Sequence, residues 1–214
     1  MKTLTLEQSQ KMMAANNGNL DLANTPIEAL PESLTVGRSL WLEGSKIKSL
    51  PKGLKVGGNL YLENTAIESL PEGLTVGRDL WLNGSKIKSL PEGLKVRGHL
   101  DLANTPIEAL PEGLTVGGDL YLRSSKIKSL PEGLKVRGHL DLAYTPIESL
   151  PEGLTVGGGL YLGGSKIKSL PQDLKVGGDL YLRSSKIRSL PQDLKVGGNL
   201  NLAHTPQSKP YRKV

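Results

Sequence analysis

The sequence contains no cysteine and no phenylalanine among its 214 residues. Without cysteine the chain can form no disulfide, no thiolate nucleophile and no cysteine-ligated metal site. Without phenylalanine the core has to be built from leucine, isoleucine and valine, which suit thin layers that repeat one small inward-facing set. Aromatic residues make up only 4% of the chain, so the few positions that they occupy are informative.

Long apolar runs are also absent. The first 19 residues hold no apolar stretch of the length that a signal peptide or a membrane-spanning helix needs. We therefore expect no membrane association and a protein that stays in the cytoplasm.

The chain has only a small excess of positive charge. The net charge of +6 comes from 27 basic and 21 acidic residues, and three of the basic ones lie in the last six positions, Lys209, Arg212 and Lys213. The body of the chain is therefore close to balanced, and its charge alone is little evidence for a nucleic-acid partner.

A unit of 20 residues repeats without a slip through most of the chain. Leucine stands at positions 20, 40 and onward to 200, each followed two residues later by another leucine, and Leu-Pro recurs from 30–31 to 190–191. A fixed period of this length is typical of a solenoid, in which each coil buries its apolar side against its neighbours. We predict a single-domain rod over residues 18–206, with about nine to ten coils.

The pattern within a coil predicts extended segments joined by tight turns. Leu60 and Leu62 alternate with polar or aromatic residues, as in a half-buried strand, and equivalent strands are expected to stack into a parallel sheet. Pro71 and Gly73 fit a tight turn. Residues 74–76 again read apolar, polar, apolar and predict a second short ladder on the far side. The fold class is therefore a β-rich solenoid with a parallel sheet on one face, short extended and turn segments on the other, and no helices in the repeats.

The two ends do not follow the repeat. Residues 1–17 contain a capping-box pair, Thr5 and Gln8, followed by good helix formers. We predict a short N-terminal helix that caps the first coil. Residues 207–214 predict a basic, flexible tail. Because this end is weakly capped, we expect a monomer or a weak end-to-end oligomer.

The repeat Leu-x-Leu-x-x-Thr/Ser-x-Ile-x-x-Leu-Pro resembles a leucine-rich repeat of the short, 20-residue type found in bacterial secreted effectors and in bacterial and prophage proteins. It departs from that family where Thr65 and its equivalents replace the usual asparagine, and where Leu-x-Val-Gly-Gly replaces the usual far-side leucine spacing. Both departures favour a flatter rod than a horseshoe. The resemblance implies a non-enzymatic scaffold that binds a protein, a bacterial or phage factor acting on a host protein, and delivery into a host cell if it is effector-like. It implies no cofactor.

Six of the eight aromatic residues stand in one outward-facing column, at the middle of the predicted strands. Aromatic residues suit exposed strand positions and stack across a ladder. They are also, with arginine, the usual anchors of protein interfaces, which makes this column the predicted partner-binding site. The predicted anchors and their supporting arginines are Trp41, Tyr61, Trp81, Tyr121, Tyr161, Tyr181, Arg123 and Arg183.

A neighbouring column alternates between acid and histidine: Asp79, His99, Asp119, His139. The two histidines lie two strands apart, about 9.6 Å at the ladder spacing, which is too far to share a zinc ion with bonds of about 2 Å. We predict no metal site and interpret the column as a charge ladder. Candidate acids and bases recur in every coil, whereas an active site is a single asymmetric arrangement, so we predict that the protein is not an enzyme.

A third column alternates Glu and Lys from Glu28 to Lys168, which predicts pairing between neighbouring coils. The alternation fails near the C-terminus, where basic residues gather. This gives an alternative function, the binding of nucleic acid or another polyanion through Lys166, Lys168, Lys175, Lys186, Arg188 and Lys195. A second alternative is a carbohydrate or nucleotide held by the aromatic column, which the lack of an evident closed pocket disfavours.

Overall fold

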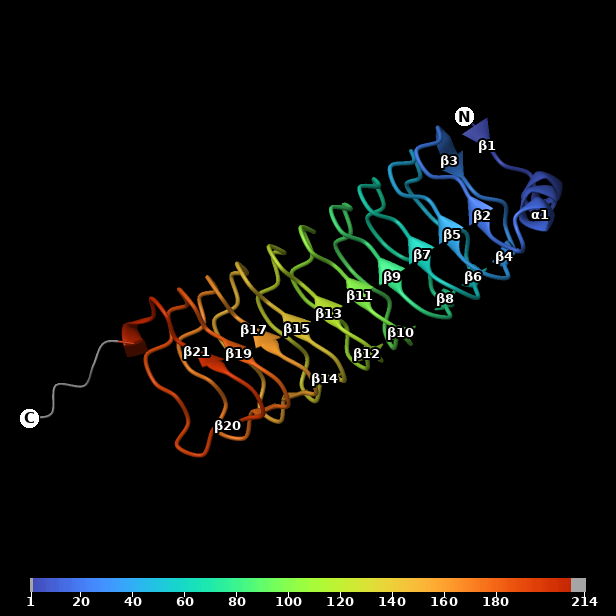
Figure 1. The fold of residues 1–214 in the computed structure, drawn as a ribbon. Helices are drawn as coiled ribbons and strands as arrows, with labels where there is room; N and C mark the ends of the chain where they lie inside the picture. The colour runs from blue at the N-terminus through green and yellow to red at the C-terminus, as the bar shows by residue number, and fades with distance from the viewer. Residues whose placement is uncertain (1, 209–214) are drawn as a thin grey trace, which may run out of the picture.

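A computed structural model describes residues 2–208 and shows a rod of stacked coils (Figure 1). The N-terminal helix lies at one end of the rod, and the coils follow a nearly straight line to the other. Two parallel sheets run along the rod, one with ten strands and one with nine. The predicted parallel sheet and the predicted far-side ladder are both confirmed.

Each strand of these two sheets is two residues long and pairs with its equivalent in the next coil. Leu60 pairs with Leu80 and Tyr61 with Trp81. The first sheet contains β2 (Leu20–Asp21), β5 (Leu40–Trp41), β7 (Leu60–Tyr61), β9 (Leu80–Trp81), β11 (Leu100–Asp101), β13 (Leu120–Tyr121), β15 (Leu140–Asp141), β17 (Leu160–Tyr161), β19 (Leu180–Tyr181) and β21 (Leu200–Asn201). The second contains β4 (Thr35–Val36), β6 (Lys55–Val56), β8 (Thr75–Val76), β10 (Lys95–Val96), β12 (Thr115–Val116), β14 (Lys135–Val136), β16 (Thr155–Val156), β18 (Lys175–Val176) and β20 (Lys195–Val196).

The core is one continuous apolar column between the two sheets. In the third coil Leu60, Leu62 and Ile67 are fully buried, and Leu74 and Val76 close the far side. The same positions are buried in nearly every coil. Each fully buried leucine or isoleucine contributes about 1.5–3 kcal/mol, so the repetition of one inward set supplies most of the stability.

A buried hydroxyl lies at the turn after most strands of the first sheet. The Thr65 hydroxyl donates a 2.7 Å hydrogen bond to the carbonyl oxygen of Leu62. Thr105, Thr145 and Ser165 donate the same bond three residues back, whereas within the described residues the hydroxyls of Ser45, Ser85 and Ser185 are buried without a hydrogen-bond partner. Where the bond forms, the hydroxyl satisfies one strand-end carbonyl.

A glycine lets the coils approach each other at the start of the return to the first sheet. A Cβ added at Gly57 would collide with the carbonyl oxygen of Gly37, and one added at Gly77 would collide with that of Gly57. No full coil precedes Gly37. A Cβ added at Gly37 would have the Gly18 carbonyl oxygen as its nearest neighbour, at 4.0 Å. At these positions the glycine therefore avoids a clash between stacked coils, although Arg97 and Arg137 stand at the equivalent position in two other coils.

Helix α1 (Leu6–Ala15) covers the open end of the first coil. The predicted capping box is present, since Thr5 and Gln8 exchange side-chain and backbone hydrogen bonds. Met13 packs against the core. Within residues 2–208 no helix is both long and apolar enough to cross a membrane.

One pairing at this end was not predicted. Strand β1 (Lys2–Thr3) lies parallel to β3 (Ile27–Ala29) and extends the first coil. At the opposite end β20 and β21 are edge strands, Leu200 is 42% exposed, and a 3-10 turn, η1 (Pro206–Ser208), follows. Residues 209–214 of the predicted flexible tail lie outside the described part of the chain.

The stacking requirement predicts unequal effects of one substitution in two adjacent coils. Gly57→Ala should lower the free energy of unfolding by about 1–3 kcal/mol, the usual cost of overpacking. Gly37→Ala, which meets no close neighbour, should change it by less than about 0.5 kcal/mol. Urea unfolding followed by circular dichroism measures both, and equal effects would contradict the role assigned to stacking.

Candidate functional site

The aromatic column lies on the outer face of the first sheet. Because leucines on either side of each aromatic residue point inward, the residue between them must point out. All six aromatic side chains are half-buried. They are thus surface residues held by their neighbours, as the alternation predicted. The full column is Asp21, Trp41, Tyr61, Trp81, Asp101, Tyr121, Asp141, Tyr161, Tyr181 and Asn201.

The rings form two separate stacks. Trp41 and Tyr61 lie 5.6 Å apart with an angle of 6° between their planes, and Tyr61 and Trp81 lie 6.4 Å apart at 8°. We call these three the N-terminal stack. Tyr161 and Tyr181 stack at 5.0 Å and 9° and form the C-terminal pair. In-register pairing brings equivalent rings together, so each ring restricts the rotamers of the next.

Asp101 ends the N-terminal stack. It pairs in the sheet with Trp81 on one side and Tyr121 on the other, and it is only 8% exposed. Its Oδ1 accepts a 2.8 Å hydrogen bond from the Ala103 N–H. Burial raises the pKa of Asp101, the Ala103 N–H acts to lower it, and nearby Asp141 raises it further. The other acids and the asparagine of the column accept the same local bond.

Unpaired polar atoms surround the N-terminal stack. Within the described residues the Trp81 Nε1, one oxygen of Glu43 and one of Glu63 are buried and have no hydrogen-bond partner. Burial raises the pKa of Glu63, and the charges of Glu43 and Asp101 add to this rise, although N–H groups of the local backbone oppose it. Buried polar groups are almost always paired, so three unpaired buried atoms beside one stack are an unusual local feature.

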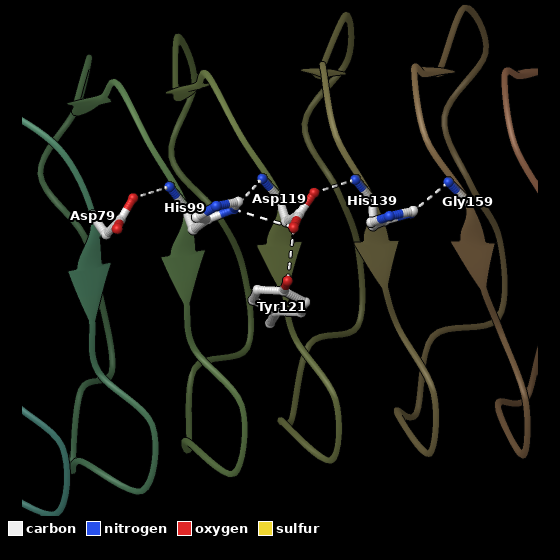
Figure 2. A network of polar contacts seen from close by, with 6 residues as sticks. All are labelled: Asp79, His99, Asp119, Tyr121, His139 and Gly159. Atoms are coloured by element: carbon white, nitrogen blue, oxygen red, sulfur yellow. Dashed lines mark hydrogen bonds and ion pairs between the residues drawn. The ribbon is translucent and has the colours of Figure 1, made fainter.

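The column that alternates Asp and His binds backbone instead of forming only a charge ladder (Figure 2). Asp79 Oδ1 accepts the N–H of His99 at 2.8 Å, and His99 Nδ1 accepts that of Asp119 at 2.9 Å. Asp119 Oδ1 accepts the His139 N–H at 2.6 Å, and His139 Nδ1 accepts the Gly159 N–H at 2.7 Å. We call these side chains the acceptor column.

The same bond recurs along the rod. Residues with an oxygen or ring-nitrogen acceptor stand at this position in every coil except the one with Gly159. Those that accept the N–H of the next coil are Asn19, Ser39, Asn59, Asp79, His99, Asp119, His139 and Asp179, and Asn199 stands in the last coil. Since Nδ1 accepts, the neutral ring carries its proton on Nε2. His99 Nδ1 also lies 3.1 Å from Asp119 Oδ2, a contact that becomes an ion pair only when the ring is protonated on Nδ1. This role was missed from the sequence, although the restriction of the position to acceptors was a signal.

The acceptor column also orients tyrosines. Tyr121 donates its hydroxyl to Asp119 Oδ2 at 2.7 Å, and Tyr181 does the same to Asp179 at 3.1 Å. Burial and the adjacent Asp119 carboxylate raise the pKa of Tyr121. Burial acts to raise the pKa of Asp119, but the bonds from the His139 N–H and from Tyr121 lower it overall. Among the described residues no group of three or more candidate metal ligands occurs.

The two predicted binding regions differ in how the structure groups them. Arg123 and Arg183 lie on the aromatic face and are exposed. The six residues of the polyanion alternative are divided, because Lys175 and Lys195 pair in the second sheet whereas Lys166, Lys168, Lys186 and Arg188 follow the turn after the first.

The predicted pairing of alternating charges is present in three places. Lys88 contacts Glu68 at 2.7 Å, Lys128 contacts Glu108 at 2.6 Å, and Lys168 contacts Glu148 at 2.7 Å. These side chains are more than half exposed, so each pair contributes little to stability. The neighbouring lysine is the largest cause of the lowered pKa of each glutamate. Lys168 is therefore already partnered within the polyanion region.

Similarity to solved structures supports the repeat fold. YopM from Yersinia enterocolitica WA-314 matches 93% of this chain and 49% of its own length, with 19% identity and a TM-score of 0.57. YopM from Yersinia pestis, described as a leucine-rich effector protein, matches 87% of this chain and 66% of its own, with 20% identity and a TM-score of 0.53. The match to a leucine-rich-repeat protein of Leptospira interrogans covers 95% of this chain and 64% of that protein, with 22% identity and a TM-score of 0.56.

These matches concern the fold. The chain spans between 49 and 66% of the length of the three structures. No model of a known protein family matches the sequence, and neither does any curated protein. The expected leucine-rich-repeat solenoid is confirmed by the architecture and by these neighbours.

The acceptor column predicts which replacements of His99 the rod tolerates. His99→Leu removes the acceptor for the Asp119 N–H, whereas His99→Asn restores an oxygen like that of Asn59. We expect the Asp119 amide to exchange its hydrogen at least about tenfold faster in the leucine variant, since a lost bond of this kind costs about 1–3 kcal/mol. Hydrogen exchange by NMR tests this, and equal protection in both variants would refute it.

Asp101 predicts a pH-dependent effect on stability. Its folded pKa is raised above the ordinary value of 3.8, so its contribution to stability is present below the unfolded pKa and is lost as pH rises through the folded pKa. Asp101→Asn keeps the Oδ1 acceptor without the buried charge. We expect this variant to unfold at higher urea concentration than the parent at pH 7, with the difference shrinking toward about pH 3. A less stable variant at pH 7 would contradict the assignment.

Proposed function

Because the chain has the fold of leucine-rich-repeat proteins, we propose that it is a non-enzymatic scaffold that binds a partner protein through the aromatic face of the first sheet. The anchors are the six aromatic residues of the column, with Arg123 and Arg183 beside them. A rigid sheet presents these rings at fixed spacing, so little conformational entropy is lost when a partner docks.

The observation that carries the proposal is the N-terminal stack. Its three rings lie nearly parallel, are half-buried, and lie on the outer face of the sheet. They fill no space in the core, which the leucines already complete. A run of large aromatic rings at the surface is the composition of an interface centre.

The setting of the interaction follows from the neighbours. YopM from Yersinia pestis is described as a leucine-rich effector protein. By analogy, this chain is a bacterial or phage factor that acts on a host protein, either in the cytoplasm or after delivery into a host cell. Because it spans only part of its neighbours' length, this analogy is part of the proposal.

A second candidate function rests on charge polarity along the rod. Residues 18–119 hold 10 basic and 13 acidic residues, a net −3, whereas residues 120–208 hold 12 basic and 7 acidic residues, a net +5. This favours attraction of a polyanion to the C-terminal half. The division of the six basic residues between two surfaces counts against one continuous nucleic-acid track.

Removal of the N-terminal stack tests the first function. Trp41→Ala with Trp81→Ala should weaken binding of a captured partner by about 30-fold or more, the effect of losing at least one interface hot spot. Lys46→Ala with Lys86→Ala changes exposed residues of the same two coils and is the matched control. Affinity capture with identification by mass spectrometry, followed by titration of the purified partner, measures the change. Unaltered affinity of the tryptophan variant, with its fold intact by circular dichroism, would exclude the N-terminal stack as the centre of the interface.

Heparin chromatography separates the second function from the first. Polyanion binding should give retention that falls steeply with salt. It should be lost in Lys168→Glu with Arg188→Glu and kept in the tryptophan variant. Retention that is unchanged by the charge reversal would contradict polyanion binding through these residues.

A further inference from the structure

One coil near the C-terminus lacks side chains that the other coils carry on the first-sheet face. Gly159 is the only glycine of its column, and Gly163 is the only glycine at the position two residues after the aromatic column. The Tyr161 ring covers Gly159, and the Tyr144 ring covers Gly164. A depression of about 290 Å³ remains on this face, and its lining includes Ala143 and Gly163.

Three tyrosines and two arginines wall this depression, which we call the Arg123–Arg183 pocket. Its lining includes Tyr161 and Tyr181, the C-terminal pair, and Tyr144. The pocket therefore combines aromatic rings with two cations. The sequence did not predict it, because its lining residues come from four coils that meet only in the stack.

Tyr144 occupies a costly backbone conformation. Its φ is +59°, in the left-handed region, where the equivalent residues are Asn, Gly, Ser or His. The side chain is 61% exposed, and its ring lies over Gly164, where an added Cβ would clash with it. A bulky residue at positive φ is a genuine outlier, and such outliers gather at functional sites. No core contact requires a tyrosine here.

Arg123 is held in place at the rim. Its guanidinium lies 4.8 Å from the centre of the Tyr144 ring, and its Nη1 lies 3.8 Å from Asp141 Oδ2. Each guanidinium carries five N–H donors. Within residues 2–208 neither Arg123 nor Arg183 donates a side-chain hydrogen bond to another residue. Their donors are available to a ligand.

The hydroxyls of Tyr161 and Tyr181 point away from the pocket. Tyr181 donates its hydroxyl to Asp179, two residues before it, and the Tyr161 hydroxyl lies over Gly159 at the equivalent position. The nearby acids are already engaged, Asp141 by the Ala143 N–H and Asp179 by Asn199 and Tyr181. The unused polar groups of the pocket are therefore chiefly the guanidinium donors of Arg123 and Arg183.

We propose that the Arg123–Arg183 pocket binds an aryl phosphate, in the form of a phosphorylated tyrosine side chain of the partner protein. This rests on the proposed function, which it refines. The edges of the tyrosine rings contact the aryl ring edge to face, and the two arginines take the doubly charged phosphate, for which guanidinium geometry is well suited. A single carboxylate would need only one arginine, and a bare phosphate would leave the tyrosine edges unused.

Small probes test the chemistry before any partner is known. Phenyl phosphate, inorganic phosphate and benzoate are titrated against the full chain by NMR at fixed ionic strength. Phenyl phosphate should bind at least about tenfold more tightly than either other probe and shift the Gly163 and Gly164 amides. Equal affinity for benzoate would identify a general acid pocket instead, and no binding at millimolar phenyl phosphate would overturn the proposal.

Charge-matched variants test the location. Arg183→Ala should weaken phenyl phosphate binding by about tenfold or more, as expected for loss of a charge-assisted pair. Arg188→Ala removes the same charge in the same coil, outside the pocket, and should leave the affinity unchanged. Equal losses in the two variants would show a non-specific charge effect and refute the pocket.

The two proposals can fail separately. Trp41→Ala with Trp81→Ala lies in the other half of the face and should not change phenyl phosphate binding. Loss of partner capture in that variant without any phenyl phosphate binding in the parent would leave the scaffold function and reject the pocket. Binding of phenyl phosphate by the parent, together with unchanged partner capture in the tryptophan variant, would reject the N-terminal stack as the anchor and keep the pocket.

Discussion

The structure depends on backbone hydrogen bonding between equivalent residues of successive coils. In the first sheet Leu60 and Leu62 donate their N–H groups to the coil that follows, and this pattern continues along the rod. A two-residue strand would not be stable alone, and a coil this thin cannot enclose a core by itself. Every coil is therefore stable only as part of the stack, which explains why the period never slips.

This constraint separates the positions that stacking fixes from those that it leaves free. The inward leucines are repeated because each meets its own copy in the next coil, and the stacking glycine is repeated in most coils for the same reason. The acceptor column is fixed only in chemical kind, since asparagine, serine, aspartate and histidine all accept the same N–H. The aromatic column is the least restricted, because its side chains differ most in size and charge from one coil to the next.

The freedom on the outer face is used unevenly along the rod. The first half carries the three-ring stack with acidic neighbours, and the second half carries the tyrosine pair with two arginines. Asp101, buried between Trp81 and Tyr121, interrupts the rings between the two parts. A surface that is polarised in this way favours one orientation of a bound partner, because reversing it would place like charges together.

The sequence by itself determined the solenoid, its two ladders, the capped N-terminus and the aromatic column. Period, alternation and capping are local patterns, and repetition multiplies each weak signal. Only the tertiary structure decided the stacking geometry of the rings, the acceptor column, the β1–β3 pairing and the Arg123–Arg183 pocket. Each of these joins residues about 20 or more positions apart, so it exists only once coils lie side by side. The hollow over Gly163 shows this most clearly, because its walls come from four different coils.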